Sequence, residues 1–143
     1  MVDQKVMVAM SGGVDSSVAA LELLKSGADC IGAIMRLCDR LTGQATGVAD
    51  AQRIADRLGF PLLVLDRQQL FEEKVVDAFV RCYEEGGTPN PCVYCNRHLK
   101  FDALLREALA QGCTHLATGH YAQIEQDPIS GRHLLKKAAD KQK

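Results

Sequence analysis

A short apolar run followed by a glycine turn constrains this chain more than any other feature. Residues 6–17 read VMVAMSGGVDSS. The run Val6–Met10 has the length of a buried strand, Gly12 and Gly13 break it, and Asp15 opens an amphipathic helix. This arrangement binds anions, because free backbone N–H groups and the positive end of the helix dipole converge on one point. The missing Cβ at each glycine lets a phosphate approach the backbone closely.

The same residues would also serve an ordinary strand-to-helix turn that a Ser or Asp side chain caps. A glycine pair followed by aspartate does not by itself decide between this structural role and phosphate binding. The spacing excludes the Walker loop, since no Lys-Ser/Thr pair follows the second glycine. The full string SGGVDSS, residues 11–17, is more specific than its parts.

Composition favours one globular domain over residues 1–143, since 47% of the residues are hydrophobic and 24% are charged. No N-terminal apolar segment has signal-peptide or membrane length, so we expect a cytoplasmic protein with no membrane association and reduced cysteines.

The net charge of −1 gives no overall footprint for nucleic acid. A local basic set would suit either RNA or a solvated surface: Arg97, His98, Lys100, Arg106, Arg132, His133, Lys136, Lys137, Lys141 and Lys143.

Strand and helix patterns alternate along the chain. Further strands are predicted at 30–35, 61–65 and 114–117, helices at 16–26, 48–58, 71–83 and 99–111, a loop at 36–47 and a hairpin at 121–136. Alternation of this kind implies right-handed βαβ units and an α/β fold, an open, mostly parallel twisted sheet with helices on both faces.

Ligands of such sheets bind beyond the carboxyl ends of the strands. We therefore expect four segments to face one site. They are the glycine turn, the residues after Met35, the residues after Asp66, and 118–120.

A second informative stretch, TPNPCVYCN at 88–96, carries the pair Cys92 and Cys95. Its two prolines predict a rigid loop. The pair could be half of a zinc site, part of an iron–sulfur site, a redox-active or nucleophilic thiol, or two buried thiols near a turn. His98 is the near neighbour that could add a ligand, so any metal held by Cys92 and Cys95 would need ligands from outside this chain.

SGGVDSS, TPNPCVYCN, the following Lys100-Phe101 and LATGHYA at 116–122 occur here in one order. In this order they resemble the tRNA-specific 2-thiouridylases of the PP-loop ATP pyrophosphatase superfamily, over essentially the whole chain. The resemblance implies a Rossmann-like fold, binding of ATP and Mg²⁺, adenylation of the wobble uridine of tRNA, and sulfur transfer from a persulfide donor protein. It also implies that this chain is the N-terminal adenylation domain of a longer enzyme.

The resemblance assigns roles to individual residues. Cys95 matches the first catalytic cysteine, and Asp15 would lie near Mg²⁺ and the phosphates. Nucleotide contacts would fall on Ala9, Met10, Ser11, Gly12, Gly13, Val14, Asp15, Ser16, Met35 and Gly119. The target base would lie near Asn90, Pro91 and Cys92, although many members carry Asp at the position of Cys92.

Three questions stay open at the level of sequence. A PP-loop synthetase that adenylates a small carboxylate would also explain SGGVDSS, and a non-catalytic nucleotide- or metal-binding module is a third reading. His120, beside the expected ATP site, suits a hydrogen-bonded structural role as well as a proton carrier. Cys30, Cys82 and Cys113 have the positions of small buried hydrophobes, whereas Cys38 falls in the expected loop.

Overall fold

The computed structural model describes residues 4–38 and 47–141. Its centre is a four-stranded sheet in the order β3-β2-β1-β4, and all of its pairings are parallel. The strands are β1 (Lys5–Ala9), β2 (Asp29–Arg36), β3 (Leu62–Asp66) and β4 (His115–Ala117). The predicted α/β fold with a mostly parallel sheet is confirmed.

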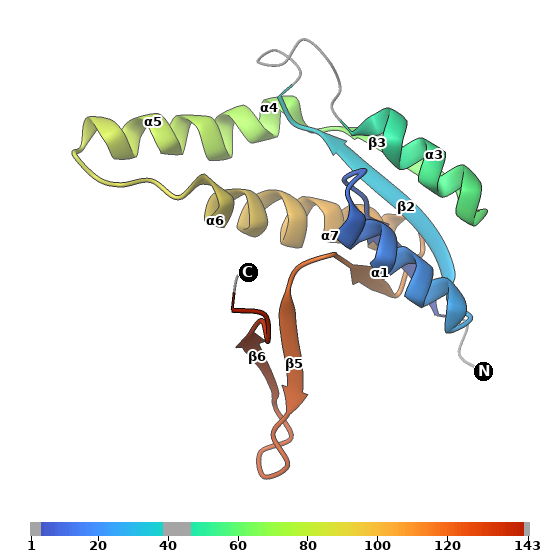
Figure 1. Ribbon diagram of the computed structural model, residues 1–143. Coiled ribbons are helices and arrows are strands. Elements are labelled where there is room, and N and C mark those ends of the chain that lie inside the picture. The colour runs from blue at the N-terminus through green and yellow to red at the C-terminus, as the bar shows by residue number, and fades with distance from the viewer. Residues whose placement is uncertain (1–3, 39–46, 142–143) are drawn as a thin grey trace.

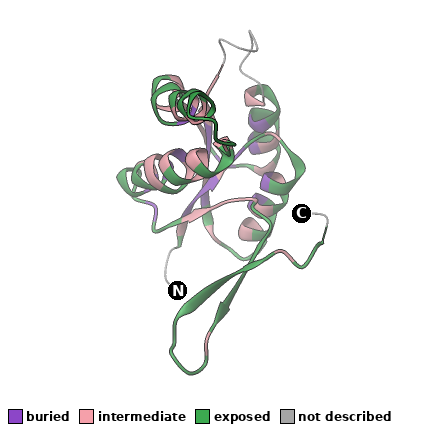
Figure 2. Ribbon diagram, turned by 90° about the vertical axis from the view of Figure 1, so that its left-hand side faces the viewer, coloured by how far each residue is buried: buried purple, intermediate pink, exposed green. Residues whose placement is uncertain are grey.

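Helices cover both faces of this sheet (Figures 1 and 2). Because side chains alternate along β1, Val8 packs with α1 (Val14–Lys25) and α3 (Val48–Leu58), whereas Met7 packs with α7 (Leu104–Ala110) on the other face. Met7 and Val8 are both fully buried. The first strand is thus the centre of two hydrophobic cores, and it ends directly at the glycine turn.

The remaining helices form two rods joined by the glycine- and proline-rich residues 85–90 (Figure 1). The first rod is α4 (Gln68–Phe71), the π-helical segment η1 (Glu72–Val76) and α5 (Asp77–Glu84). The second rod is α6 (Pro91–Cys95), the π-helical segment η2 (Asn96–Ala103) and α7. Leu99 and Leu104 are the large buried side chains of the second rod.

The second rod corrects one prediction. The Cys92–Cys95 pair lies in a helix, whereas the sequence predicted a rigid loop, and the helix predicted from Leu99 begins at Pro91. Asn90 is extended with φ −121° and ψ 90°, and Pro91 occupies the first helical turn. Proline is favoured there, because its fixed φ suits a helix and the N–H that it lacks would have had no intrahelical partner.

A hairpin of β5 (Ala122–Gln126) and β6 (His133–Lys137) projects away from the body of the molecule (Figure 1). Ile124 pairs with Leu135, and every residue of both strands is exposed (Figure 2). The predicted hairpin is therefore present. Of the predicted loop at 36–47, the first residue belongs to β2, and 39–46 lie outside the described residues.

Candidate functional site

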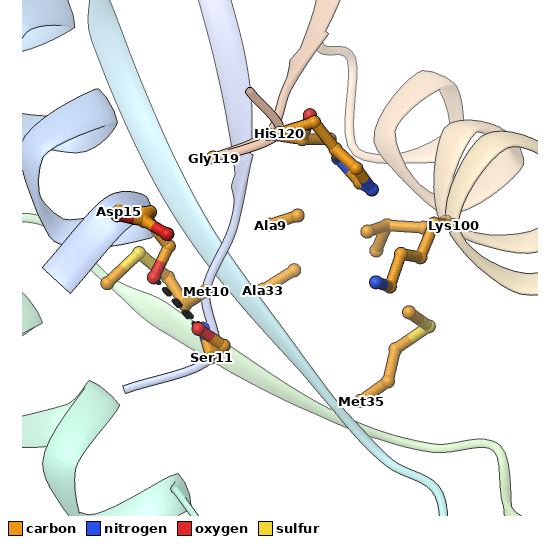
Figure 3. A pocket seen from close by; sticks show the side chains of 12 residues that line it. Ala9, Met10, Ser11, Asp15, Ala33, Met35, Lys100, Gly119 and His120 are labelled. Carbon is orange, nitrogen blue, oxygen red and sulfur yellow. Dashed lines mark hydrogen bonds between the residues drawn. The ribbon is translucent and has the colours of Figure 1, made fainter. Parts of the chain in front are cut away.

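A cavity of about 240 Å³ opens beyond the carboxyl ends of β1, β2 and β4 (Figure 3). The two central strands and the last one supply its floor, the glycine turn and α1 one wall, and the second rod the opposite wall. It is lined by Ala9, Met10, Ser11, Asp15, Ser16, Ala33, Met35, Lys100, Leu104, Thr118, Gly119 and His120. This is the edge at which open parallel sheets bind ligands.

The glycine turn is held by hydrogen bonds between serines and the backbone. The N–H of Ser11 donates to Ser16 Oγ at 3.2 Å, and the Ser16 hydroxyl donates to the carbonyl of Gly13 at 3.2 Å. Ser16 is only 4% exposed, so these bonds also satisfy a buried polar group. The N–H of Ser17 begins the helical ladder by donating to Gly13 O, so the N–H groups of the three residues between them stand at the helix N-terminus. That arrangement suits a phosphate or another anion.

Two glycines permit close packing around this turn. Gly12 has φ +78°, and a Cβ there would lie 2.7 Å from the carbonyl oxygen of Gly47. At Gly119 a Cβ would lie 2.7 Å from the backbone N of Ser16, so the end of β4 rests directly on the start of α1. A Cβ at Gly13 would meet Ser11 Oγ at 3.3 Å and nothing else as close. Gly12 and Gly119 therefore serve the fold, whereas Gly13 leaves open space at the cavity edge.

Asp15 lies at the N-terminal end of α1, where its charge complements the helix dipole. Its Oδ1 accepts a hydrogen bond from the Tyr121 hydroxyl at 3.2 Å. This contact ties the carboxylate to the segment that follows Gly119 and sets it on the rim that faces the cavity (Figure 3).

Lys100 on the second rod and His120 after the end of β4 both reach into the cavity with their side chains (Figure 3). His120 Nδ1 lies 2.8 Å from Thr118 Oγ1, and Nε2 lies 3.2 Å from Asn96 Oδ1. Burial, and then the charge of Lys100, lower the pKa of His120 and favour the neutral imidazole. In the tautomer that satisfies both neighbours, Nε2–H donates to Asn96 and Nδ1 accepts from the Thr118 hydroxyl.

The cysteine pair lies at the start of the second rod, outside the cavity lining. Cys92 is exposed and Cys95 is partly buried. Burial raises the pKa of the Cys95 thiol, and the nearby Lys100 ammonium partly opposes this effect. Lys100 therefore influences both the cavity that it lines and the thiol five positions before it.

Within residues 4–38 and 47–141, no group of three or more His, Cys, Asp or Glu side chains is placed to hold a metal ion. A structural zinc site takes four ligands and an iron–sulfur cluster is held by several cysteines, so the two thiols alone do not fit either group. His98 does not complete the pair. Metal binding by Cys92 and Cys95 stays a prediction that requires ligands from elsewhere.

The structure gathers most of the predicted nucleotide-contacting residues around one cavity. Ala9, Met10, Ser11, Asp15, Ser16, Met35 and Gly119 line it, and Gly12 and Gly13 form the adjoining turn. Val14 instead lines a neighbouring cavity of about 560 Å³ beside Tyr121. Asn90, Pro91, Cys92 and Cys95 are not among the residues that line these two cavities.

One predicted segment is not part of this site. The residues after Asp66 line separate cavities with Gln69 and Leu70, because β3 is the edge strand beyond β2. The Asp66 carboxylate accepts the backbone N–H of Gln68 at 3.1 Å, which starts α4 immediately and lowers the pKa of that carboxyl. The glycine turn and residues 118–120 therefore meet as expected, whereas Met35 itself, and not the residues that follow it, lines the cavity.

The sequence analysis did not assign Ala33, Leu104 and Lys100 to the cavity. Ala33 was recognisable as a residue near the end of a buried strand. Lys100 was assigned to a basic surface, and its place in the cavity depends on how the second rod packs against β4. No local pattern in the sequence indicates this position for Lys100.

The fold and this site define a class, the doubly wound α/β domains with a glycine turn at the carboxyl edge of a parallel sheet. Comparison with known families makes the assignment specific. The chain belongs to the family described as the tRNA methyl transferase HUP domain, whose family model matches residues 4–143. No helix in the described parts of the chain has the length and apolar character needed to cross a membrane.

Curated relatives carry the name tRNA-specific 2-thiouridylase MnmA. The chain is 47% identical over 149 residues to the one from Clostridioides difficile strain 630, covering 99% of this chain and 41% of that relative. It is 46% identical over 150 residues to the one from Carboxydothermus hydrogenoformans, covering 98% and 41%. The chain thus spans about two fifths of the length of these relatives.

Solved structures show the same fold at low identity. A predicted subunit of tRNA methyltransferase from Methanocaldococcus jannaschii matches with a TM-score of 0.56 and 23% identity over 89% of this chain and 58% of that one. NMN synthetase from Francisella tularensis matches with a TM-score of 0.51 and 20% identity over 80% and 44%. At these identities the likeness concerns the fold alone.

Proposed function

We propose that this chain is the ATP-binding and base-activating part of a tRNA-specific 2-thiouridylase. One observation carries the proposal. A single cavity joins an anion-binding glycine turn to the helical rod that begins with the Cys92–Cys95 pair. The names of relatives that are 46–47% identical support thiolation of tRNA as the reaction. Residues 1–143 act as one adenylation domain within a longer protein.

The cavity fits ATP. The β- and γ-phosphates take the N–H groups of the turn between Ser11 and Ser16, where a helix N-terminus favours negative charge. The apolar side chains of Ala33, Met35 and Leu104 line the same cavity and offer a surface for adenine. Asp15 fits Mg²⁺, which proteins hold through one or two carboxylates together with substrate phosphates. When bound, the ion neutralises charge that develops on the departing pyrophosphate.

The reaction forms and breaks bonds in sequence. The 2-oxygen of the wobble uridine attacks the α-phosphorus, the bond between the α- and β-phosphates breaks, and the N3 proton and pyrophosphate leave. The outer sulfur of a persulfide on Cys95 then attacks C2 of the base, and AMP leaves with the former 2-oxygen. A second thiol attacks the Cys95 sulfur, so the S–S bond breaks, the 2-thiolated base is released and Cys95 is left in a disulfide with that thiol. The Lys100 ammonium, which reaches into the cavity, stabilises negative charge on the phosphates in the first step (Figure 3).

Cys95 is the residue we assign to sulfur transfer, and Asn90, Pro91 and Cys92 are assigned to the neighbourhood of the target base. A persulfide donor protein supplies the sulfur. Lys100 acts on Cys95 in the direction that favours the thiolate, which is the reactive form. Because the reaction needs tRNA and ATP, we place it in the cytoplasm.

Pyrophosphate exchange tests the proposal in the full-length protein that carries this sequence. Exchange of label between pyrophosphate and ATP should require added tRNA with an unmodified wobble uridine. The same tRNA with a 2-thiolated wobble base is the matched control and should give none. Exchange that proceeds with small carboxylates and without tRNA would identify a synthetase instead. Absence of exchange with both would favour a non-catalytic module.

A further inference from the structure

Two motifs that the sequence analysis treated separately touch each other in the fold. Asn96 directly follows Cys95, and His120 directly follows Gly119 at the end of β4. The two side chains are 24 positions apart in sequence, and His120 Nε2 lies 3.2 Å from Asn96 Oδ1. This hydrogen bond joins the thiol-bearing end of the second rod to His120, which lines the cavity.

The histidine end of this bond is held firmly. Thr118 Oγ1 lies 2.8 Å from its Nδ1. The ring of Phe101, which belongs to the second rod, packs against the imidazole with centroids 5.3 Å apart and is a second contact between that rod and His120. Gly119, between Thr118 and His120, rests on the N-terminus of α1, where a Cβ would be only 2.7 Å from Ser16 N. His120 therefore presents its Nε2–H from a fixed point on the glycine-turn side of the cavity.

The cysteine end of this bond lies in a helical turn without a buried side chain of its own. No residue of α6 is buried, and the first fully buried side chain along the second rod is Leu99. The N–H groups of the first helical turn have no intrahelical partners, so the start of a helix frays easily. Cys95 lies at the end of α6, which contacts η1 and α5 of the first rod and continues into η2. The contact at Asn96 is the hydrogen bond that ties the residue next to this thiol to the end of β4.

We infer that Asn96 is a positioning residue, which accepts the His120 Nε2–H and so fixes the Cys95 turn relative to the glycine-turn edge of the cavity. The catalytic meaning of this inference rests on the proposed function, whereas the restraint itself does not. A misplacement of about 1 Å at a reacting group costs on the order of 100-fold in rate, so one such restraint affects sulfur transfer strongly. Adenylation uses the glycine turn, and Asn96 does not line that cavity.

Variants of Asn96 in the full-length protein test the catalytic part. Asn96→Leu keeps the approximate shape and removes the acceptor, whereas Asn96→Asp keeps an acceptor oxygen. Asn96→Leu should slow single-turnover thiolation by roughly 10- to 100-fold. It should leave tRNA-dependent pyrophosphate release within about twofold, and Asn96→Asp should restore most of the thiolation rate. Gln111→Leu, the same change at the far end of the rod, is the matched control and should change neither step.

The restraint is tested without ATP or tRNA by the rate at which iodoacetamide alkylates Cys95, measured by mass spectrometry at one pH. Asn96→Leu and His120→Asn should raise this rate about fivefold, the factor that the net loss of one hydrogen bond gives. In His120→Gln the amide nitrogen takes the approximate place of Nε2, whereas in His120→Asn it takes that of Nδ1. His120→Gln and Asn96→Asp should therefore be alkylated no faster than the unmodified sequence.

The two assays separate the two ways of failing. If the alkylation pattern holds but the full-length protein makes no thiolated uridine, the proposed function is wrong and the restraint stands. If thiolation occurs and Asn96→Leu matches the unmodified protein in both assays, the positioning role is wrong and the function stands. An Asn96→Asp variant as slow as Asn96→Leu, with its helical signal intact, would also overturn the role of the hydrogen bond.

Discussion

The glycine turn lies at the start of α1, and the helical turn that carries Cys92 and Cys95 lies at the start of the second rod, yet the two are built differently. The glycine turn directly follows β1, whose Met7 and Val8 are fully buried, and its binding groups are backbone N–H groups. The cysteine turn lies on α6, which has no buried residue, and its reactive groups are side chains. The first is fixed by the core, whereas the second packs against η1 and α5 without a buried side chain of its own and is joined to the end of β4 through the Asn96–His120 hydrogen bond.

This difference predicts opposite sensitivities. Added atoms should damage the glycine turn, because close approach of a phosphate depends on the absence of Cβ atoms. Removed atoms should damage the cysteine turn, because its chemistry depends on one thiol and on the side chains that place it. The variants below test each half of this contrast.

The largest effect is expected for Cys95→Ser in the full-length protein. Thiolated uridine should fall by at least about 1,000-fold, as is usual when a nucleophile is removed. Release of pyrophosphate that depends on tRNA should persist, because the glycine turn is untouched. Both products can be quantified in one reaction, by nucleoside mass spectrometry and a coupled pyrophosphate assay.

Cys113→Ser is the control for that variant. Cys113 is 3% exposed and packs in the core with Met7 and Leu104. It has no part in the proposed chemistry. Its change should lower stability and leave both steps largely intact. Thiolation near the unmodified yield in Cys95→Ser would give the cysteine pair a structural role only.

Gly13→Val addresses the other half of the contrast. Gly13 has φ −90°, and a Cβ there meets only Ser11 Oγ within the closest range, at 3.3 Å. The domain should therefore stay folded, while ATP affinity should fall by at least about 100-fold because the side chain occupies the phosphate position. Calorimetric titration with an ATP analogue, beside circular dichroism, measures both. Gly13→Ala should give a smaller loss, and undiminished affinity in folded Gly13→Val would refute the phosphate site.

Gly12→Ala should lower the free energy of unfolding, and not only the affinity for ATP. The residue has φ +78°, which costs about 1–2 kcal/mol with a Cβ, and that Cβ would press on the Gly47 carbonyl at 2.7 Å. Gly112 has φ +74° with nothing within 4 Å, so Gly112→Ala reports the backbone cost alone. The free energy of unfolding in urea should fall by about 2–3 kcal/mol for Gly12→Ala and by about 1–2 kcal/mol for Gly112→Ala. Equal losses of unfolding free energy in Gly12→Ala and Gly112→Ala would mean that the glycine turn shifts to accommodate the added Cβ without further cost.

The smallest effect concerns pH. Burial raises the pKa of Cys30 and of Cys113, both of which lie in the cores that hold β1. Above the ordinary thiol value of 9.0 the unfolded chain releases these protons while the folded chain keeps them. Raising the pH through this range therefore favours unfolding, and stability that is constant below it should decline.

Urea unfolding at a series of pH values from 7 upward measures the decline, and Cys113→Val should reduce it. A decline of the same size in Cys113→Val would assign the effect to other groups. The decline reports on the cores that support the glycine turn, because Cys30 and Cys113 belong to those cores and not to the cysteine turn.

The glycine turn could be predicted because its signals are local. An apolar run, two glycines and a polar helix start stand in one stretch, and the buried strand fixes where they point. The helical state of Cys92 and Cys95 was missed because Pro91 was interpreted as a helix breaker, although at a first helical position it favours the helix. Lys100 in the cavity and the Asn96–His120 contact depend on how the second rod packs against β4, which no local pattern encodes.

The exposed hairpin has a consequence for the motions of this chain. An isolated two-stranded hairpin is marginally stable in water, and here neither strand contributes a buried side chain. Its amides should open separately from the sheet, so in deuterated buffer β5 and β6 should exchange while β1 stays protected. A protease should first cut at the tip, where Ile129 is 95% exposed. Because that cut falls beyond Tyr121, every residue that lines the cavity would remain on one fragment.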